Sequence, residues 1–386
     1  MKQLMVQPKI MMVASDGTSD LFGASLASGL QSLNRDVSMF GIGSSHMREA
    51  GVRLLYDIRD LDTLGVIQSI KGAHVIRRLI YRISESMERF RPDLLLQVGR
   101  PVFNYRLLEL AKTKRIPVMY YYTPLSVGDA DVKLDRFAKM IDRVAGVTLY
   151  ETQICQEGGM AADFVGHPLV DLARPDLDRA AARAEFGLTA EKPVVVLWPG
   201  KRTVEAKALL PIMLKALGRI RTVLPDVQGA ISLADNVEEE IVQRSVAKCG
   251  VDVSIIRNSY DLLQLADLAV VTCGSSGLGA ALLRTPAIAL HRMPSSNYLA
   301  DKMLSRRQHL AVPNILLNKA LIPELVQADC TESALAQEML RLLQDREARA
   351  AMVDSYAELD EQLGEPGSIQ RAASMVSETL RRSMSA

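Results

Sequence analysis

The chain has 386 residues, with 46 Lys and Arg against 45 Asp and Glu, so its formal net charge is +1. This length favours roughly two to three domains with a sizeable core. The near balance of charge excludes the strong positive field that nucleic acid binding requires, and we expect no nucleic acid partner.

The four cysteines stand far apart without a CxxC pattern, which favours thiols of a reduced compartment over disulfides or zinc ligands. The apolar N-terminus is broken by Gln3, Gln7 and Pro8 and has no basic region of a signal peptide. No stretch reaches the ~18 apolar residues of a spanning helix. We therefore expect a cytoplasmic protein, and contact with the inner membrane surface stays open.

Apolar, strand-like runs alternate with helix-like segments in the first part of the chain. The predicted strands are residues 10–15, 37–43, 94–99, 118–123, 144–150 and 164–167. The predicted helices are residues 21–33, 64–90 and 105–114. Buried strands separated by helices are typical of a parallel, doubly wound sheet.

A charged, Ala-rich segment at residues 171–190 predicts a junction, after which the alternation starts again. The second set has predicted strands at 194–198, 227–233, 253–256 and 268–271 and after the Thr285-Pro286 break, and predicted helices at 204–223, through Cys249 and at 278–284. We predict an N-terminal Rossmann-like domain at 1–168, a second one at 169–365, and a C-terminal helix at 366–386 that packs back on the first domain. The two α/β halves would face a cleft, with ligands at the carboxyl ends of the strands.

The most informative loop is Gly274-Ser275-Ser276-Gly277, between a strand and a predicted helix. Small residues let a ligand approach the backbone, and a helix N-terminus presents N–H groups and a positive dipole to it. This pattern predicts a phosphate or diphosphate site. A tight βα turn is the structural alternative, because the loop lacks both GxGxxG and the P-loop lysine.

Lys201 and Arg202 follow the strand at 194–198 and open the next helix. Two cations beside a helix N-terminus oppose the helix dipole, which favours an anionic partner over a purely structural role. Asn314 lies in a Pro-Asn pair, which on its own is a turn signal. His167 ends a strand where the domains join, and a hydrogen-bonded structural histidine is the preferred interpretation.

Two further loops follow strands of the first half. Asp16 and Asp20 come after the first strand, where capping of the next helix alone explains them. Asn104 comes after the strand at 94–99 and stands where it would cap the following helix. Both loops belong to the strand ends that face the expected cleft.

Along nearly the whole chain, a series of short motifs resembles, in the same order, those of the lipid-A-disaccharide synthases, which are glycosyltransferases of the GT-B fold. The pieces that carry the resemblance are Ser19-Asp20 with Gly23, Leu64-Gly65-Val66, Arg91-Pro92-Asp93, Phe103-Asn104, Thr123-Pro124, Phe164-Val165-Gly166-His167, Pro199-Gly200 with Arg202, Gly274-Ser275, and Pro313-Asn314 leading into Glu324-Leu325.

The resemblance implies a GT-B fold and transfer of diacylglucosamine from UDP-2,3-diacylglucosamine to 2,3-diacylglucosamine 1-phosphate (lipid X), with release of UDP. It implies a diphosphate clamp without a metal or other cofactor, a general base for the acceptor hydroxyl, and apolar surface for acyl chains. The residues assigned to the nucleotide diphosphate are Arg202, Lys201, Gly274, Ser275, Ser276 and Asn314. The catalytic candidates are Asp16, Asp20 and Asn104.

The chain departs from the family at chemically important positions. The family's Asp-Ala-Pro-Asp-Phe-Asn, which holds a carboxylate regarded as catalytic, becomes Gly99-Arg100-Pro101-Val102-Phe103-Asn104. A glutamate that would meet a ribose is replaced by Gly279, and Asp16 stands in place of a longer acid. Asp16 is therefore the preferred base.

Two other functions stay open beside the lipid A disaccharide synthesis that the resemblance implies. One is a divergent GT-B transferase with another donor or acceptor. The other is a catalytically silent paralogue that binds a nucleotide sugar or a lipid. Turnover separates the two enzymes from the silent paralogue.

The long predicted helix at 67–90 mixes apolar residues with Lys71, Arg77, Arg78, Arg82 and Arg89. A basic, amphipathic helix suits an anionic membrane surface, and an ordinary packed helix with a solvated edge explains it equally well. The sequence also leaves open whether two copies form a homodimer.

Overall fold

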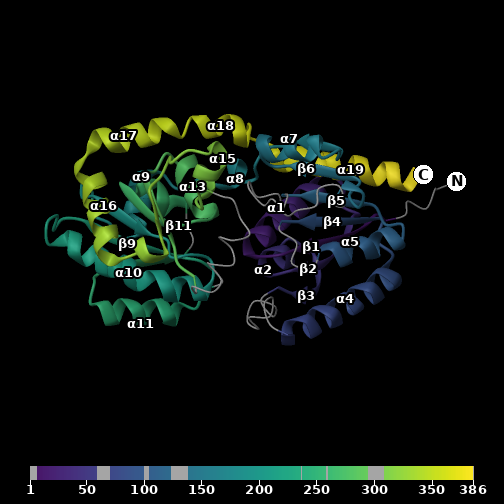
Figure 1. Cartoon of the computed structure of the whole chain (residues 1–386), viewed down its shortest axis with the longest axis horizontal. Coiled ribbons are helices and arrows are strands. Elements are labelled where there is room, and N and C mark those ends of the chain that lie inside the picture. Colours follow the sequence, from purple (N-terminus) through teal and green to yellow (C-terminus); the bar gives the residue numbers. More distant parts are fainter. Residues whose placement is uncertain are drawn as a thin grey trace. The chain divides into compact units, whose positions relative to one another are not determined.

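The computed structural model describes residues 7–58, 70–99, 104–122, 138–235, 237–257, 260–293 and 308–385 (Figure 1). These residues form two compact units, each built on its own sheet. The first unit contains the described residues up to Asp171 and those from Gln362 onward, and the second contains Leu172–Glu361.

The first unit has a seven-stranded sheet in the order β3-β2-β1-β4-β5-β6-β7, and every pairing is parallel. Its strands are β1 (Lys9–Ala14), β2 (Ser38–Gly43), β3 (Arg53–Asp57), β4 (Leu94–Val98), β5 (Val118–Tyr121), β6 (Arg143–Gly146) and β7 (Ala162–Phe164). The strand order reverses between β1 and β4, so the crevice at their carboxyl ends is where such sheets bind ligands.

The second unit has a six-stranded parallel sheet in the order β10-β9-β8-β11-β12-β13. Its strands are β8 (Val194–Leu197), β9 (Gln228–Leu233), β10 (Ser254–Arg257), β11 (Leu268–Thr272), β12 (Ala287–His291) and β13 (Glu324–Val326). The corresponding reversal lies between β8 and β11. The predicted fold class, two parallel-sheet α/β domains, is confirmed.

Helices connect the strands in both units. Those of the first unit are α1 (Gly17–Leu33), α2 (Ser45–Glu49), α4 (Ile70–Phe90), α5 (Asn104–Thr113), α7 (Leu149–Glu157), α8 (Leu169–Leu172), which straddles the boundary, and α19 (Ser368–Ser385). Those of the second are α9 (Arg179–Glu185), α10 (Thr203–Arg221), α11 (Glu239–Cys249), α12 (Tyr260–Leu265), α13 (Ser275–Leu282), α15 (Val312–Leu317), α16 (Glu332–Gln344), α17 (Arg346–Ser355) and α18 (Glu358–Leu363), which also straddles the boundary, with a short 3₁₀ turn, η2 (Gln327–Asp329).

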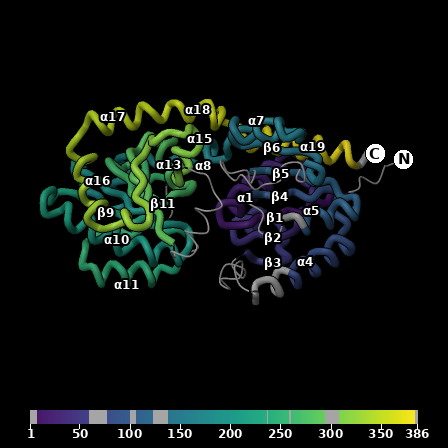
Figure 2. Tube along the Cα trace, viewed as in Figure 1, coloured from purple at the N-terminus to yellow at the C-terminus, as the bar shows by residue number. Residues whose placement is uncertain are grey.

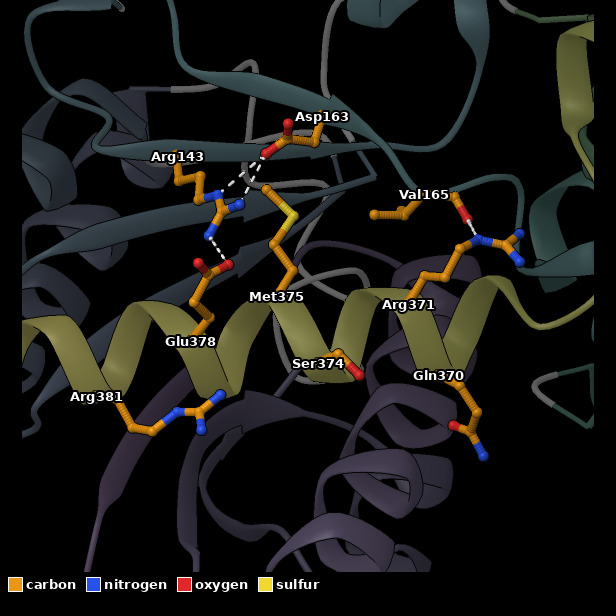
Figure 3. A pocket seen from close by; sticks show the side chains of 9 residues that line it. All are labelled: Arg143, Asp163, Val165, Gln370, Arg371, Ser374, Met375, Glu378 and Arg381. Atoms are coloured by element: carbon orange, nitrogen blue, oxygen red, sulfur yellow. Dashed lines mark hydrogen bonds and ion pairs between the residues drawn. The ribbon is translucent and has the colours of Figure 1, made fainter.

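The last helix, α19, packs against the first, α1, so the two ends of the chain share one unit (Figure 2). Gly29 of α1 permits this approach, since a Cβ there would lie 3.1 Å from Ile369 and 3.3 Å from Ala373. On its other side α19 is joined to the sheet edge by Arg143 of β6, which donates to Glu378 at 2.7 Å and to Asp163 of β7 at 2.9 Å (Figure 3).

The differences from the predicted elements have local causes. The strand predicted at 144–150 ends at Gly146, because Thr148 caps α7 by accepting the Glu151 N–H. Helix α13 begins at Ser275, three residues earlier than predicted, so the loop serines belong to its first turn. The prediction missed β3 and β13, which are short edge strands without a fully buried residue.

Within the described residues, no helix is long and apolar enough to cross a membrane. All four cysteines carry free thiols, of which those of Cys155 and Cys330 are buried. The described residues also contain no group of three His, Cys, Asp or Glu side chains that would hold a metal ion.

Candidate functional site

The loop between β11 and α13 lies at the strand-order reversal of the second sheet. Gly274 is the N-cap of α13 and supplies no side-chain cap to the first turn. Ser276 is buried and its hydroxyl lies 3.2 Å from Thr272 Oγ1, which fixes the turn. The amides of this turn and the positive end of the helix dipole face the carboxyl edge of the sheet, an arrangement suited to an anion.

Lys201 joins this loop to the neighbouring one, which follows β8. Its Nζ donates to Ser275 Oγ at 2.9 Å, so the lysine spans the crevice between β8 and β11. The structure thereby brings together Lys201, Gly274, Ser275 and Ser276, four of the residues that the sequence assigned to a diphosphate. A cation fixed beside a helix N-terminus strengthens the site for an anion.

Glu205 organises the β8 loop, and the sequence analysis missed it. Its carboxylate accepts the Lys201 backbone N–H at 3.1 Å and the Arg202 Nε at 2.8 Å. Gly200 has a φ of +116°, and a Cβ there would lie 2.5 Å from Glu205 Oε2. The detectable signal was an acid in the first turn of α10, three residues after its N-cap, which is a capping-box position.

Arg202 is 59% exposed, and its guanidinium also donates to Glu205 through Nη2 at 2.5 Å. Lys201, Arg202 and the Glu205 carboxylate thus meet at the start of α10. An anionic ligand would compete with Glu205 for Arg202. The role of Arg202 as a diphosphate ligand stays a prediction.

Asn314 has a structural role in α15. It is fully buried; its Nδ2 donates to the Ile322 carbonyl at 2.8 Å and to Glu324 Oε1 at 2.7 Å, and its Oδ1 accepts the Ile322 N–H at 2.9 Å. Glu324 in turn accepts the backbone N–H groups of Leu310 and Ala311 near the start of the same helix. The Asn314 carboxamide thus already has three hydrogen bonds inside the protein.

The first unit has its own polar loop at the reversal between β1 and β4. Asp16 is the N-cap of α1, and its Oδ1 accepts the Ser19 N–H at 2.8 Å and the Ser19 hydroxyl at 2.9 Å. Its Oδ2 accepts no hydrogen bond from the described residues. The carboxylate is partly exposed and preoriented, as a proton acceptor requires.

Gly99, which follows β4, lies directly against this loop. Its φ is +78°, and a Cβ would lie 2.0 Å from Ser19 Oγ and 3.1 Å from Ser15 Oγ. The Ser15–Ser19 hydroxyl pair, 3.1 Å apart, therefore occupies the space that a side chain at position 99 would need. The space that an aspartate side chain would need at position 99 is therefore filled by the β1 loop.

Asp20 is fully buried and holds α2 in place. Its Oδ1 accepts the Ser44 N–H at 2.5 Å, and its Oδ2 accepts the His46 N–H at 3.1 Å and lies 3.2 Å from His46 Nδ1. These contacts engage both carboxylate oxygens in the N-terminus of α2. Asp20 was predicted as a catalytic candidate, and this burial favours the structural role that was its alternative.

The third catalytic candidate, Asn104, lies at the edge of the described residues, so only its backbone is described. Asn104 is the first residue of α5, and its side chain lies outside the described part of the chain. Residues 100–103 lie outside it as well.

His167 is buried in an aromatic cluster of the first unit. Phe22 and Tyr122 meet its ring edge-to-face at centroid distances of 5.5 Å and 6.1 Å, and its Nδ1 accepts the Leu169 N–H at 3.1 Å. Burial lowers the pKa of His167 to about 3, so the imidazole is neutral at physiological pH. These contacts support the structural interpretation over a catalytic one.

Comparison with known proteins places this site in a family context. Residues 10–379 match the model of a family described as lipid-A-disaccharide synthetase. A lipid-A-disaccharide synthase of Syntrophus aciditrophicus is 32% identical over 376 residues, covering 97% of this chain and 98% of the relative. One from Geobacter sulfurreducens is 31% identical over 373 residues, covering 96% and 97%.

Solved structures share the fold at low identity. A UDP-GlcNAc 2-epimerase from Neisseria meningitidis, bound to UDP-GlcNAc, superposes with a TM-score of 0.65 at 14% identity, covering 97% of this chain and all of that chain. The Anabaena protein HepE, in complex with UDP and glucose, gives 0.55 at 12% identity, covering 97% and 100%. Both likenesses concern the two-sheet architecture.

Proposed function

Because the chain belongs to the lipid-A-disaccharide synthetase family, we propose that it transfers diacylglucosamine from a UDP-sugar to 2,3-diacylglucosamine 1-phosphate (lipid X), forming the lipid A disaccharide and UDP. The observation that carries the proposal is the match over residues 10–379, which spans both sheets. In this chemistry the acceptor 6-hydroxyl attacks the anomeric carbon of the donor sugar, and the bond from that carbon to the diphosphate oxygen breaks.

The second unit would hold the donor. Its leaving diphosphate gains charge as the bond breaks, and preorganised amides and cations stabilise such charge. The first turn of α13 supplies the amides, and Lys201, hydrogen-bonded to Ser275, supplies a fixed cation. Arg202 would exchange its contact with Glu205 for a diphosphate oxygen.

The first unit would hold the acceptor and the general base. Asp16 Oδ1 is committed to Ser19, and Oδ2 is the oxygen that would take the proton of the acceptor hydroxyl. Asp20 is the less suitable candidate, because both of its carboxylate oxygens accept N–H groups at the start of α2. Both substrates carry acyl chains, so we also propose that the protein works at the cytoplasmic surface of the membrane.

UDP release from candidate donors, with and without lipid X, tests the function. Release that depends on lipid X is the expected result. Release that depends on a different acceptor would support the divergent transferase, and UDP binding without turnover on any acceptor would support the silent paralogue.

The donor clamp is tested separately by calorimetry with UDP. Arg202→Ala removes a charged donor and should weaken UDP affinity about ten- to a hundredfold, or roughly 1.5–3 kcal/mol. Arg341→Ala is the matched control, because Arg341 is similarly exposed and forms the same kind of pair with Glu338 three residues away in α16. Equal UDP affinity in Arg202→Ala and the parent would remove Arg202 from the clamp.

A further inference from the structure

An aromatic pair stands at the carboxyl edge of the second sheet, close to the phosphate loop. Trp198 directly follows β8, and Tyr260 opens α12 after β10. Their ring centroids are 6.2 Å apart with an interplanar angle of 66°. Because the strands are parallel, these residues lie at the same edge as the start of α13.

Tyr260 lies against α13 at Gly279. A Cβ on Gly279 would lie 3.2 Å from Tyr260 Cε1 and 3.9 Å from its hydroxyl. Among the described residues, and leaving out the chain neighbours and the helix's own backbone, these are the only atoms within 4 Å of that point. The Tyr260 ring thus covers the position from which a side chain at 279 would start, and its hydroxyl is the nearest polar side-chain group.

The pair offers hydrogen-bonding groups in a buried setting. Trp198 is 2% exposed, and its Nε1–H has no hydrogen-bond partner among the described residues. Buried indole N–H groups usually find an acceptor, so an unmatched one points to a ligand or water. Burial raises the pKa of Tyr260 to about 12, which keeps its phenol protonated and able to donate at physiological pH.

The place of Gly279 along α13 indicates which part of a bound ligand would contact Tyr260. Gly279 lies four residues after Ser275, about 6 Å further along the helix axis. For a nucleoside diphosphate whose phosphates rest on the first turn, the adjoining group at that distance is a sugar. The transferred hexose has to stay accessible to the acceptor, whereas Trp198 is 2% exposed and Tyr260 is only partly exposed, so the ribose suits this place.

Resting on the proposed function, we propose that Tyr260 is a specificity-determining residue of the donor site, whose hydroxyl hydrogen-bonds a ribose hydroxyl of the bound nucleoside diphosphate. Trp198 forms the wall behind Tyr260 and orients its ring. Tyr260 thereby supplies a contact that Gly279, without a side chain, does not provide.

The test compares UDP with 2′,3′-dideoxy-UDP, which lacks both ribose hydroxyls. The parent should bind UDP roughly three- to tenfold more tightly than the dideoxy analogue through this contact. Tyr260→Phe should lose most of that preference while its affinity for the dideoxy analogue stays unchanged. Tyr356→Phe is the matched control, because Tyr356 is another buried tyrosine of the second unit, and it should keep the preference.

Trp198 is the single tryptophan of the chain, so fluorescence excited selectively in tryptophan reports on this place alone. UDP should change the Trp198 emission of the parent, and an unaltered spectrum of ligand-free Tyr260→Phe verifies its fold. If the parent and Tyr260→Phe share one ratio of UDP to dideoxy-UDP affinity, the inference is overturned while UDP binding stands. If the parent does not bind UDP, the proposed donor site and the inference are both overturned.

Discussion

Asp16 combines two roles that a substitution can separate. Asn is as good an N-cap as Asp, and Asp16→Asn keeps the oxygen that accepts from Ser19. The amide does not take up a proton, so turnover should fall roughly 10²–10⁴-fold while UDP affinity is nearly unchanged. Asp178→Asn, at the N-cap of α9, is the matched control and should leave turnover intact. Parent-like turnover in Asp16→Asn would show that another group is the base.

Gly99 limits how the family's carboxylates can be restored. Gly99→Asp forces a side chain into the left-handed region and onto Ser19, at a combined cost of at least about 2 kcal/mol in unfolding free energy. Gly159→Asp is the matched control, because Gly159 has nearly the same φ, +77°, with nothing within 4 Å. Urea unfolding should show a clearly larger loss of unfolding free energy for Gly99→Asp than for Gly159→Asp. Equal losses would mean that the Ser19 contact is easily relieved.

Val102 lies outside the described residues, so the restoration there is judged by activity alone. Val102→Asp returns one of the two lost carboxylates and leaves Gly99 unchanged. A large gain in disaccharide synthesis would show that the family chemistry was lost at this position and that the rest of the site is intact.

His167 should make folding stability depend on pH. Its folded pKa, about 3, is below the value near 6.5 expected in the unfolded chain, so the unfolded state binds more protons between these values. Stability contributed by the neutral imidazole is therefore present above pH 6.5 and is lost as pH falls toward 3. From pH 7 to pH 5 the loss should be about 2 kcal/mol.

The variant His167→Asn checks this assignment, since its side-chain oxygen can still accept the Leu169 N–H. Urea unfolding should show that, from pH 7 to pH 5, the unfolding free energy of the variant falls by about 2 kcal/mol less than that of the parent. Identical decreases would mean that the imidazole is protonated in the folded state or is not buried in solution.

At the scale of elements, α4 differs from the amphipathic membrane helix that the sequence left open. Its residues Leu79, Ile83 and Met87 are buried in the core of the first unit. The exposed side carries Arg77, Arg78, Arg82 and Arg89, with Tyr81 64% exposed. This part of the helix therefore offers charge rather than an apolar face to a membrane.

Binding to anionic vesicles should accordingly be weak. It should fall steeply with salt, because salt screens the attraction between the arginines and the lipid headgroups. Arg77→Glu/Arg78→Glu should abolish co-sedimentation at low salt. Arg381→Glu/Arg382→Glu on α19 changes the net charge equally and is the control. Absence of parent binding at low salt would remove membrane contact through α4.

Sequence patterns predicted most elements because buried parallel strands are continuous apolar runs, as in β1, β4 and β8. They missed β13, whose three residues are all partly buried. For the site, small residues and cations identified the α13 loop and Lys201. Glu205 stands at a capping-box position that a local pattern can identify. The packing of Ser19 against Gly99 and the Trp198–Tyr260 pair depend on how distant segments meet, which local pattern does not encode.

For the whole molecule, each unit has its own parallel sheet with a strand-order reversal, and each reversal carries one half of the proposed chemistry. The β1–β4 reversal carries Asp16, and the β8–β11 reversal carries Lys201 and the start of α13. Donor binding and proton removal are therefore assigned to different units. Variants of one unit should change UDP affinity, and variants of the other should change turnover.

The most direct test of the central claim measures both products when the purified protein acts on UDP-2,3-diacylglucosamine and lipid X. UDP is assayed enzymatically, and the lipid product is identified and counted by mass spectrometry. We expect one disaccharide 1-phosphate for each UDP released, and no UDP when lipid X is omitted. UDP formed without disaccharide, or no product of either kind from protein that binds UDP, would contradict the claim that this chain is a lipid A disaccharide-forming transferase.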